Sequence, residues 1–465
     1  MSHVLVLGAG PAGAAAAERL SAHGHEAVVI ERADRVGGAA GSTEIDGVRV
    51  DFGSHRLHRA IDPSILADLD AKLGDDLQRR PRRGRIRLAG RWLPFPLGIG
   101  AIGELPRDFA VRAAFDALTA GLRRPRADTF AEVIRAGLGP TMLERFYGPY
   151  ARKLWGLDAG EIAGEQARRR VTASSPAALA ARLLRGGRGE RGTFLYPRRG
   201  FGQLWETLAA SATAQGAHFH LGANAAAIRW SSHGVAIDLD DGTRLTGDQL
   251  WSTIPLPALV GLAEPQPPAS VVAAAASLRT RAMVCVYLVL DTPRYAEADA
   301  HYFPESWTPV TRISEPKNYR DGHPGTGDDG DPTDRTVLCA EVPCNVGDPL
   351  WSLDDDALGD TVVQTLERAG LPTPSVRRVA THRLPAAYPI YDRGFAARLA
   401  RVDDWASAQP RLLTFGRQGL FVHDNSHHAL TMAWSAVAAI GRDGLVDADA
   451  WRAARARFTI HVVED

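Results

Sequence analysis

The sequence predicts an α/β fold: a parallel sheet assembled from discontinuous segments of the chain, a helical cap and an antiparallel β-sheet domain. An apolar run at 3–7, an Ala-rich helical segment at 14–20 and a second apolar run at 27–30 form the β–α–β pattern typical of a parallel sheet. Residues from about 98 to 190 are rich in Ala, Leu and Arg with helical periodicity, which predicts the cap. Residues 278–392 contain strand-like runs that predict the antiparallel sheet.

The parallel sheet is expected to take its strands from three separate parts of the chain. Residues from about 200 to 262 again alternate helix and strand, and a third part begins near residue 411. We therefore predict a Rossmann-like nucleotide-binding domain into which the other two domains are inserted. The predicted boundaries are 1–85, 196–275 and 401–465 for the Rossmann-like parts, 86–195 for the helical cap and 276–400 for the β-sheet substrate domain.

The turn after the first predicted strand carries a dinucleotide-binding fingerprint. It reads Gly8-Ala-Gly10-Pro-Ala-Gly13, and Glu31 ends the next strand. Gly8 permits the tight turn, Gly10 lets the backbone approach a pyrophosphate, and Gly13 lets the helix pack closely on the strand. The helix N-terminus offers N–H groups and a positive dipole end to the phosphates, while Glu31 can accept both ribose hydroxyls. Because strand, helix and acid are in register, the pattern predicts dinucleotide binding rather than a chance Gly-rich turn.

The residues after Glu31 favour FAD over a nicotinamide cofactor. A second glycine pair, Gly37-Gly38, lets the chain fold back over the pyrophosphate, and a Gly-rich surface loop is the alternative. The stretch resembles the two-dinucleotide-binding flavoprotein superfamily, which includes amine oxidases, protoporphyrinogen oxidase and UDP-galactopyranose mutase. The resemblance implies an FAD-binding domain whose ADP half is held by Gly8, Gly10, Ala12, Gly13, Glu31, Arg32, Gly37 and Gly38.

Composition narrows the function classes and the compartment. The 54 basic and 54 acidic residues balance, so there is no electrostatic case for nucleic acid or for an anionic membrane as partner. The chain has three cysteines, an odd number that argues against a disulfide framework and fits a reducing cytoplasm. No apolar stretch has membrane-spanning length, and the chain enters its first strand without a signal peptide. We therefore expect a cytoplasmic protein.

Several later segments resemble UDP-galactopyranose mutase and its flavoprotein relatives, in the same order along the chain. The first is Gly53-Ser-His55-Arg-Leu-His58, which is similar to the histidine loop beside the flavin. The resemblance places His55 near the isoalloxazine ring. The alternative is a histidine that caps a strand end.

The second segment is a predicted helix from Phe146 to Gly156. In the mutase family this helix carries the aromatic platform that sandwiches uracil, and the matching residues are Phe146, Tyr147, Tyr150 and Trp155. An aromatic pair five residues apart is also common in a hydrophobic core. In the following run of three arginines, Arg169 falls where the family places a diphosphate-binding arginine. A solvated face is the alternative for such a run, and the assignment could slip by one residue.

The third and fourth segments complete the diphosphate site that the resemblance implies. Residues 309–317 are similar to the strand that supplies the second diphosphate arginine, which is Arg312 here. Tyr388 matches the tyrosine before proline that bonds the same diphosphate, and Tyr391 follows it. Two arginines and a tyrosine hydroxyl can hold a pyrophosphate and neutralise it as a leaving group. An ordinary strand edge with a turn is the alternative for each segment alone.

The last segment, from Gly416 to His428, resembles the final FAD motif. The resemblance places Arg417 near the flavin and the N-terminus of a helix, predicted to begin about Ala429, at the flavin N1–C2=O edge. It makes Asn425, Ser426 and His427 cofactor-binding residues. We do not predict a metal site, because the histidines and carboxylates lack consistent ligand spacing. His423 and Asp424 replace the tyrosine pair of the mutase, so the sugar end of the pocket is expected to differ.

The resemblance implies an FAD-dependent sugar-nucleotide mutase that isomerises pyranose and furanose rings. Attack of reduced flavin N5 on the anomeric carbon would require FAD in its reduced form, with NADPH or NADH as candidate external reductant. Catalytic roles fall to His55, Arg169 and Arg312, and a nucleotide-diphosphate sugar is the expected substrate. The main alternative is an FAD-dependent oxidase or desaturase of the amine oxidase or protoporphyrinogen oxidase type. A flavin-containing binding protein without chemistry is the third hypothesis.

Overall fold

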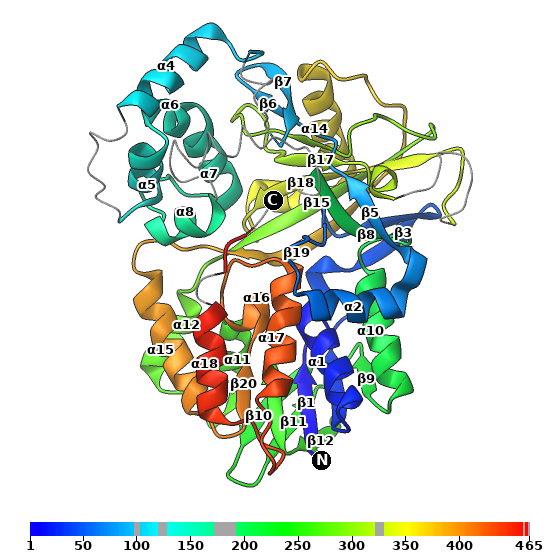
Figure 1. Cartoon of the computed structure of the whole chain (residues 1–465), viewed down its shortest axis with the longest axis vertical. Helices are drawn as coiled ribbons and strands as arrows, with labels where there is room; N and C mark the ends of the chain where they lie inside the picture. The colour runs from blue at the N-terminus through cyan, green and yellow to red at the C-terminus, as the bar shows by residue number, and fades with distance from the viewer. Residues whose placement is uncertain (97–102, 120–127, 172–191, 321–329, 459–460, 464–465) are drawn as a thin grey trace.

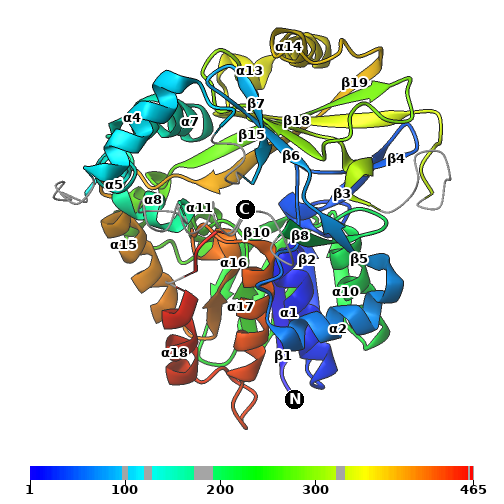
Figure 2. The same ribbon diagram turned by 45° about the horizontal axis from the view of Figure 1, so that its top comes forward.

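The computed structural model describes residues 1–96, 103–119, 128–171, 192–320, 330–458 and 461–463. Figure 1 shows two halves, one above the other. The lower half holds the parallel sheet and its helices, and the upper half holds a large second sheet with the helical cap beside it. Figure 2 shows the same arrangement after a turn, with the cap helices next to the second sheet. The predicted α/β fold class is confirmed.

A five-stranded parallel sheet forms the centre of the lower half. Its central strand is β1, whose residues are almost entirely buried because helices or strands cover both faces. The strand order is β20 (Leu412–Thr414), β13 (Gln249–Ser252), β1 (His3–Leu7), β2 (Glu26–Glu31) and β9 (His218–Leu221). These strands come from the three predicted parts of the chain, so the discontinuous Rossmann-like domain is observed.

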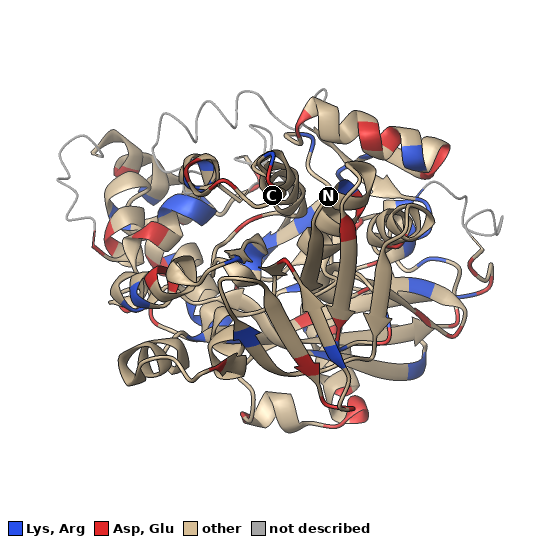
Figure 3. Ribbon diagram, turned by 90° about the horizontal axis from the view of Figure 1, so that it is seen from below, with Lys and Arg blue, Asp and Glu red and all other residues tan. Residues whose placement is uncertain are grey.

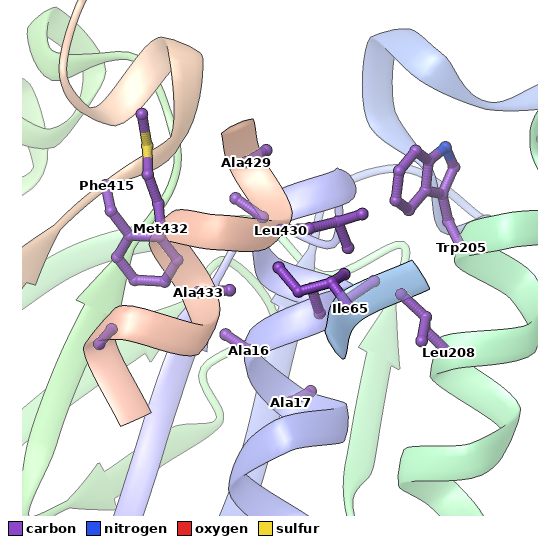
Figure 4. Close-up of a cluster of buried hydrophobic side chains, with 14 of the residues drawn as sticks. Ala16, Ala17, Ile65, Trp205, Leu208, Phe415, Ala429, Leu430, Met432 and Ala433 are labelled. Carbon is purple, nitrogen blue, oxygen red and sulfur yellow. The ribbon is translucent and has the colours of Figure 1, made fainter. Parts of the chain in front are cut away.

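Small side chains let the helices on one face of this sheet pack closely. Figure 4 shows Ala16 and Ala17 of α1 beside Leu430 and Ala433 of another helix, with Trp205 on the other side. Alanines allow the helix axes to approach, and the close contact fixes the start of each helix at the sheet edge. The helices of this layer are α1 (Pro11–Ala22), α2 (Pro63–Leu73), α10 (Gln203–Ala214), α17 (Ser426–Ala438) and α18 (Ala448–Phe458).

The other face of the parallel sheet is covered by a smaller sheet and three helices. Leu5, Leu7, Val28 and Ile30 point into this second core. The small sheet has the order β12 (Arg244–Gly247), β11 (Val235–Leu239), β10 (Ala225–Trp230) and β14 (Ala263–Glu264). The helices are α11 (Leu256–Leu262), α12 (Ala269–Ala276) and α15 (Phe395–Ala408), and α15 spans the predicted boundary at residue 400.

The second sheet has seven strands, and its long strand β15, second from one edge, is buried along nearly its whole length. Helix α14 (Asp355–Arg368) covers one face, and the hairpin of β3 (Ser42–Ile45) and β4 (Val48–Asp51) packs on the other. The strand order is β19 (Val376–Pro389), β15 (Thr280–Leu290), β18 (Thr336–Cys344), β17 (Arg312–Ser314), β16 (Ala300–Tyr302), β6 (Gly84–Leu88) and β7 (Arg91–Phe95).

The helical cap begins later than the predicted boundary at residue 86. Strands β6 and β7 belong to the seven-stranded sheet, where β6 pairs with β16, so most of 84–95 is not part of the cap. The described cap elements are α4 (Arg107–Leu118), α5 (Phe130–Gly137), α6 (Pro140–Met142), the π-helical turn η4 (Leu143–Tyr147), α7 (Gly148–Trp155) and α8 (Gly164–Arg170). Strands β5 (Leu77–Pro81) and β8 (Thr193–Pro197) pair at the junction with the lower half.

The remaining short elements lie in the connections: η1 (Gly38–Ala40), η2 (Gly74–Asp76), η6 (Pro316–Tyr319), α13 (Pro349–Ser352) and α16 (Gly416–Gly419). In Figure 3, basic and acidic residues are interspersed over the described elements, in line with the balanced composition. None of the helices in the described part of the chain is both long and apolar enough to cross a membrane.

Candidate functional site

The turn between β1 and α1 requires glycine at two positions. Gly8 has a φ of +101°, and a Cβ there would lie 2.6 Å from Thr253 Oγ1. A Cβ on Gly13 would lie 1.8 Å from the Gly8 carbonyl oxygen, so α1 meets the end of β1 at a distance that only glycine permits. A Cβ on Gly10 would meet no atom nearer than 4.0 Å. Gly10 therefore leaves room for a phosphate beside the N-terminus of α1.

Glu31 and the second glycine pair form the other side of this cradle. Glu31 Oε2 accepts a hydrogen bond from Ala9 N at 2.8 Å, and the carboxylate has further lone pairs for a ribose hydroxyl. Gly37 N donates to Ala9 O at 2.8 Å, and a Cβ on Gly38 would lie 3.1 Å from Gly10 Cα. The two glycine turns face each other with no side chain between them, which fits the ADP part of FAD.

The two other residues predicted to hold the ADP group differ in exposure. Ala12 is buried, and a Cβ on Gly416 would lie 2.8 Å from Ala12 Cβ, so α16 rests directly on the start of α1. Arg32 is exposed immediately after Glu31. Ala12 thus contributes close packing, while Arg32 is open to solvent at the rim of the cradle.

The third part of the domain supplies a second helix N-terminus. Helix α17 begins at Ser426, three residues before the predicted start at Ala429, because Asn425 and His428 form a capping box. Asn425 N donates to His428 Nδ1 at 3.0 Å, a role that sequence patterns assign to Glu or Gln rather than His. Asn425, Ser426 and His427 therefore stand at the first turn of α17, where N–H groups and the positive dipole end suit an electron-rich edge of a reduced flavin.

His55 is held by backbone carbonyl groups. Its Nε2 lies 3.0 Å from both Ala39 O and Phe52 O, and its ring stacks on Phe201 at a centroid distance of 5.3 Å. Burial lowers the pKa of His55, which keeps the imidazole neutral at neutral pH. The structure thus fixes the orientation of His55 beside the glycine cradle.

Arg56, in the same loop, was not singled out by the sequence although it lies inside the quoted motif. Its guanidinium pairs with Asp299 at 3.2 Å and donates to the hydroxyls of Tyr302 and Tyr319 at 3.0 and 3.2 Å. Asp299 is almost fully buried. Arg56 therefore ties the histidine loop to the seven-stranded sheet.

Arg312 lies in the site with its charge already paired. Its Nη2 lies 2.6 Å from Glu341 Oε1 and 3.1 Å from Ser54 O, and its Nε is 3.0 Å from the same carboxylate oxygen. Arg312 and Glu341 are directly opposite each other on β17 and β18. None of the sequence motifs pointed to Glu341. The available signal was a single acid inside the otherwise apolar run of β18, which is unusual for a fully buried strand.

Three arginines surround Tyr388 at the end of β19. Arg170 and Arg417 lie with their Cζ atoms 5.5 and 5.8 Å from the Tyr388 ring centre, and Arg312 acts on its hydroxyl electrostatically. Burial and Glu341 raise the pKa of Tyr388, while the three arginines oppose the increase. The Tyr388 hydroxyl makes no hydrogen bond within the described residues, so it is available to a ligand.

The charges around Tyr388 do not cancel. Glu341 pairs with Arg312, and Asp424 pairs with Arg417 at 3.2 Å. Arg170 has no carboxylate partner within the described ranges, which leaves one positive charge uncompensated. The predicted Arg169 is paired instead with Glu165 at 2.8 Å on the same helix. Arg170 is therefore a candidate anion-binding residue that the sequence placed one position away.

The four aromatic residues predicted for substrate binding have different surroundings. Phe146 and Tyr150 are half-buried and nearly parallel, with ring centres 6.1 Å apart, and Tyr147 packs edge-on to Phe146 at 4.7 Å. Trp155 is 3% exposed and packs on Phe130 inside the cap core. The π-helical turn η4 carries Phe146 and Tyr147, and such turns are frequent at functional sites.

Tyr391 is also buried in a core rather than open to a ligand. Its ring stacks on Phe395 at 4.0 Å, and its hydroxyl donates to Phe421 O at 3.0 Å. The backbone at Tyr391 holds the cap: Ala163 N donates to Tyr391 O at 2.7 Å, and Gln166 Oε1 accepts from Tyr391 N at 2.9 Å. Tyr391 thus anchors helix α8 to the end of β19.

A model of one family, flavin-containing amine oxidoreductase, matches residues 11–434. The chain belongs to this family. It is therefore an FAD-dependent enzyme of the flavin amine oxidase superfamily, in agreement with the glycine cradle at β1. Two curated relatives are similar over short segments: phytoene dehydrogenase of Streptomyces griseus is 40% identical over 91 residues, and putrescine oxidase of Kocuria rosea is 40% identical over 81 residues. These segments cover 20% and 17% of this chain and only 17% and 16% of the relatives.

Several solved structures share the fold of this chain. A reduced UDP-galactopyranose mutase has a TM-score of 0.81 at 20% identity and covers 99% of each chain. A protein of Exiguobacterium sp. 255-15, provisionally assigned as a protoporphyrinogen oxidase, has a TM-score of 0.71 at 21% identity over 94% of this chain and 98% of that one. A putrescine oxidase bound to putrescine has a TM-score of 0.64 at 18% identity over the same shares. At these identities the likeness establishes the fold.

His423 and Asp424, for which the sequence predicts a departure from the mutase motif, lie just before α17. Both side chains are buried, and the His423 ring packs edge-on to Tyr391 at 4.9 Å. Burial and the neighbouring arginines lower the pKa of His423, whereas burial raises the pKa of Asp424 to about 6 against the opposing effect of Arg417. Within the described residues, no group of three or more His, Cys, Asp or Glu side chains is placed to hold a metal ion.

Because several histidines are buried in their neutral form, we expect the free energy of unfolding to fall in acid. Burial lowers the pKa of His301 to about 4 and that of His428 to about 2, against 6.5 in an unfolded chain. Below pH about 6.5 the unfolded state therefore binds protons that the folded state does not, and each histidine lowers the free energy of unfolding by up to about 1.4 kcal/mol per pH unit. Asp424 opposes this change between pH about 6 and 4, because its raised pKa favours the protonated folded state.

Urea unfolding at pH 7.5 and pH 5 checks this prediction, with pH values chosen on either side of about 6.5. We expect His301→Phe to reduce the difference between the two free energies of unfolding. His218→Phe, at an exposed position of β9, is the matched control and should leave the difference unchanged. Equal pH dependence in all three proteins would show that His301 does not contribute.

Proposed function

We propose that this flavoenzyme is a redox-neutral sugar-nucleotide mutase that isomerises the ring of a nucleotide-diphosphate sugar on reduced FAD. The observation that carries the proposal concerns Arg170 and Tyr388: within the described residues, the positive charge of Arg170 has no carboxylate partner and lies beside a tyrosine hydroxyl that makes no hydrogen bond. An apolar or amine substrate gives such a cluster nothing to bind, whereas a diphosphate accepts hydrogen bonds from both groups.

In this proposal the chain's own residues bind and orient the substrate. Tyr388 and Arg170 hold the diphosphate, and Arg312 and Arg169 add positive field although Glu341 and Glu165 pair with them. The half-buried rings of Phe146, Tyr147 and Tyr150 offer faces for the base, while Trp155 keeps their helix in place.

The catalytic role of His55 is to stay neutral and fixed beside the cofactor cradle, held by the carbonyls of Ala39 and Phe52. Arg417 and the start of α17 stabilise negative charge at the cofactor edge. Bound FAD supplies the nucleophilic and electron-donating chemistry at the sugar, with dithionite, NADPH or NADH as the reductant. The diphosphate leaves more readily because the arginines neutralise its charge.

Anaerobic incubation of the purified holoenzyme with a panel of UDP-, dTDP- and GDP-sugars tests the function. Each sugar is incubated with oxidised and with reduced flavin, and the products are separated by chromatography. We expect an isomer of unchanged mass that forms only with reduced flavin. Turnover of a sugar with oxidised flavin alone, or of none of the sugars in either state, would overturn the mutase proposal.

Replacing Arg170 tests the observation that carries the proposal. Arg170→Ala should weaken nucleotide binding by roughly 1.5–3 kcal/mol, because it removes a charged donor from the Tyr388 hydroxyl cluster. Arg168→Ala is the matched control, because Arg168 is exposed two residues earlier on the same helix. Isothermal titration with UDP measures both variants. Equal affinities of the two variants for UDP would contradict a role for Arg170.

A second candidate function is oxidation of an amine or an apolar substrate. It is favoured by the carboxylates Glu341 and Asp424, which neutralise two of the three arginines around Tyr388. The same anaerobic assay separates the candidates. An oxidase would lose its flavin absorption when mixed with an amine or a polyene and would ignore the nucleotide sugars.

A further inference from the structure

Three buried polar groups meet between the cap and the FAD-binding domain without the hydrogen bonds that buried groups normally make. They are Arg169 Nη1, His423 Nε2 and Asp424 Oδ2, none of which has a partner within the described part of the chain. The exposed fractions are 1% for His423, 2% for Asp424 and 12% for the Arg169 side chain. Most buried polar atoms in proteins are paired, so these three atoms, together at one place, are available to hydrogen-bond a bound group.

The three groups come from opposite sides of one boundary and converge on Tyr391. Arg169 lies on the cap helix α8 with its Cζ atom 6.0 Å from the Tyr391 ring centre, and the His423 ring lies 4.9 Å from the same ring. Arg169 acts electrostatically on both His423 and Asp424. The hydrogen bonds of Ala163 and Gln166 to Tyr391 hold α8 in this place, so the convergence is built into the fold.

The donor and acceptor pattern selects the chemistry of the missing group. Arg169 can only donate. Burial and the neighbouring arginines lower the pKa of His423 and favour its neutral form; since its ring donates to the Pro389 carbonyl, the unpaired Nε2 is left to accept. Asp424 Oδ2 accepts when ionised. An anion cannot donate to His423 and is repelled by Asp424, whereas an ammonium is repelled by Arg169. Hydroxyl groups both accept and donate, and two adjacent hydroxyls satisfy all three atoms.

We propose that Arg169, His423 and Asp424 form a binding site for two adjacent hydroxyl groups on the sugar part of the substrate. The proposal rests on the proposed nucleotide-sugar function and names the residues that choose the sugar. It divides the pocket into a phosphate end at Tyr388 and a hydroxyl end at Tyr391, three residues further along the chain. Arg169 is thereby assigned to the sugar and Arg170 to the phosphate, as neighbouring residues of a helix point about 100° apart.

Binding of three probes to the reduced holoenzyme tests the site: UDP, UDP-galactose or UDP-glucose, and a methyl hexopyranoside. The variants are Asp424→Leu, the near-isosteric Asp424→Asn and His423→Phe. We expect each to weaken UDP-sugar binding about tenfold or more and to change UDP binding by less than about twofold. Tyr388→Phe should weaken both UDP and UDP-sugar. Asp403→Leu on α15, whose partner is Arg455, is the matched control and should change neither.

The outcomes separate this site from its alternatives. If the variants leave the ratio of the UDP and UDP-sugar affinities unchanged, or alter the flavin midpoint potential alone, the three atoms bind water or the cofactor and the proposal is wrong. If the wild-type protein binds no nucleotide, the proposed function is wrong. Binding of the methyl hexopyranoside then decides whether the hydroxyl-binding site exists. A saturation-transfer NMR signal of this sugar that is present with wild type and lost with Asp424→Asn supports the site. No saturation transfer from wild type to the sugar overturns it.

Discussion

Replacing Gly13 with alanine is expected to yield a protein that is purified without FAD. The added Cβ would lie 1.8 Å from the Gly8 carbonyl oxygen, so α1 must move away from the end of β1. The N–H groups at the start of α1 then no longer meet the pyrophosphate where the glycine cradle holds it. We expect FAD affinity to fall about 100-fold or more, which corresponds to about 2.8 kcal/mol. Visible flavin absorption of the purified protein and titration of the apoprotein with FAD measure the effect.

Gly261→Ala in α11 is the matched control for this experiment. Gly261 has nothing within 4 Å of an added Cβ, so the same change in side chain meets no obstacle. It should retain stoichiometric FAD. A Gly13→Ala protein that remains yellow, with the affinity of the control, would mean that the β1–α1 turn does not hold the cofactor.

The parallel sheet could be predicted because its signal is local. β1, α1 and β2 follow one another within 31 residues, and each strand is apolar along its length because both faces are covered. The last two strands at one side of the second sheet, β6 and β7, gave no such local signal. β6 and β7 are short, and the predicted cap boundary at residue 86 placed most of them in the helical cap. Only the pairing of β6 with β16, more than 200 residues later, and of β7 with β6 shows where they belong.

The sequence motifs predicted candidate residues for the site, but not the contacts that these residues make. The motif pointed to Arg312, yet its carboxylate partner lies 29 residues later and is brought opposite by the pairing of β17 with β18. The run from Arg168 to Arg170 could not be resolved either. The three side chains point in different directions around α8, and only the packing of that helix on Tyr391 fixes which one reaches Tyr388.

Removing the carboxylate of Glu341 is expected to be among the most destabilising single changes in the site. Glu341→Leu leaves the largely buried Arg312 guanidinium without its counter-ion and also removes the acceptor of Ser54 N, which donates at 2.7 Å. Breaking a buried ion pair in this way typically costs about 3–5 kcal/mol. Urea unfolding of the holoenzyme measures the loss. Glu206→Leu is the control, because its pair with Arg49 is partly exposed and should be worth less than about 1 kcal/mol.

The double variant Arg312→Met/Glu341→Leu then separates structure from function. With no unpaired charge left, it should recover most of the stability lost in Glu341→Leu, because an apolar pair can replace a buried ion pair at little net cost. If Arg312 also supplies positive field to the diphosphate, the stable double variant still binds UDP more weakly than wild type. Recovered stability with unchanged UDP affinity would make Arg312 and Glu341 a purely structural pair, and the phosphate would depend on Arg170 and Tyr388 alone.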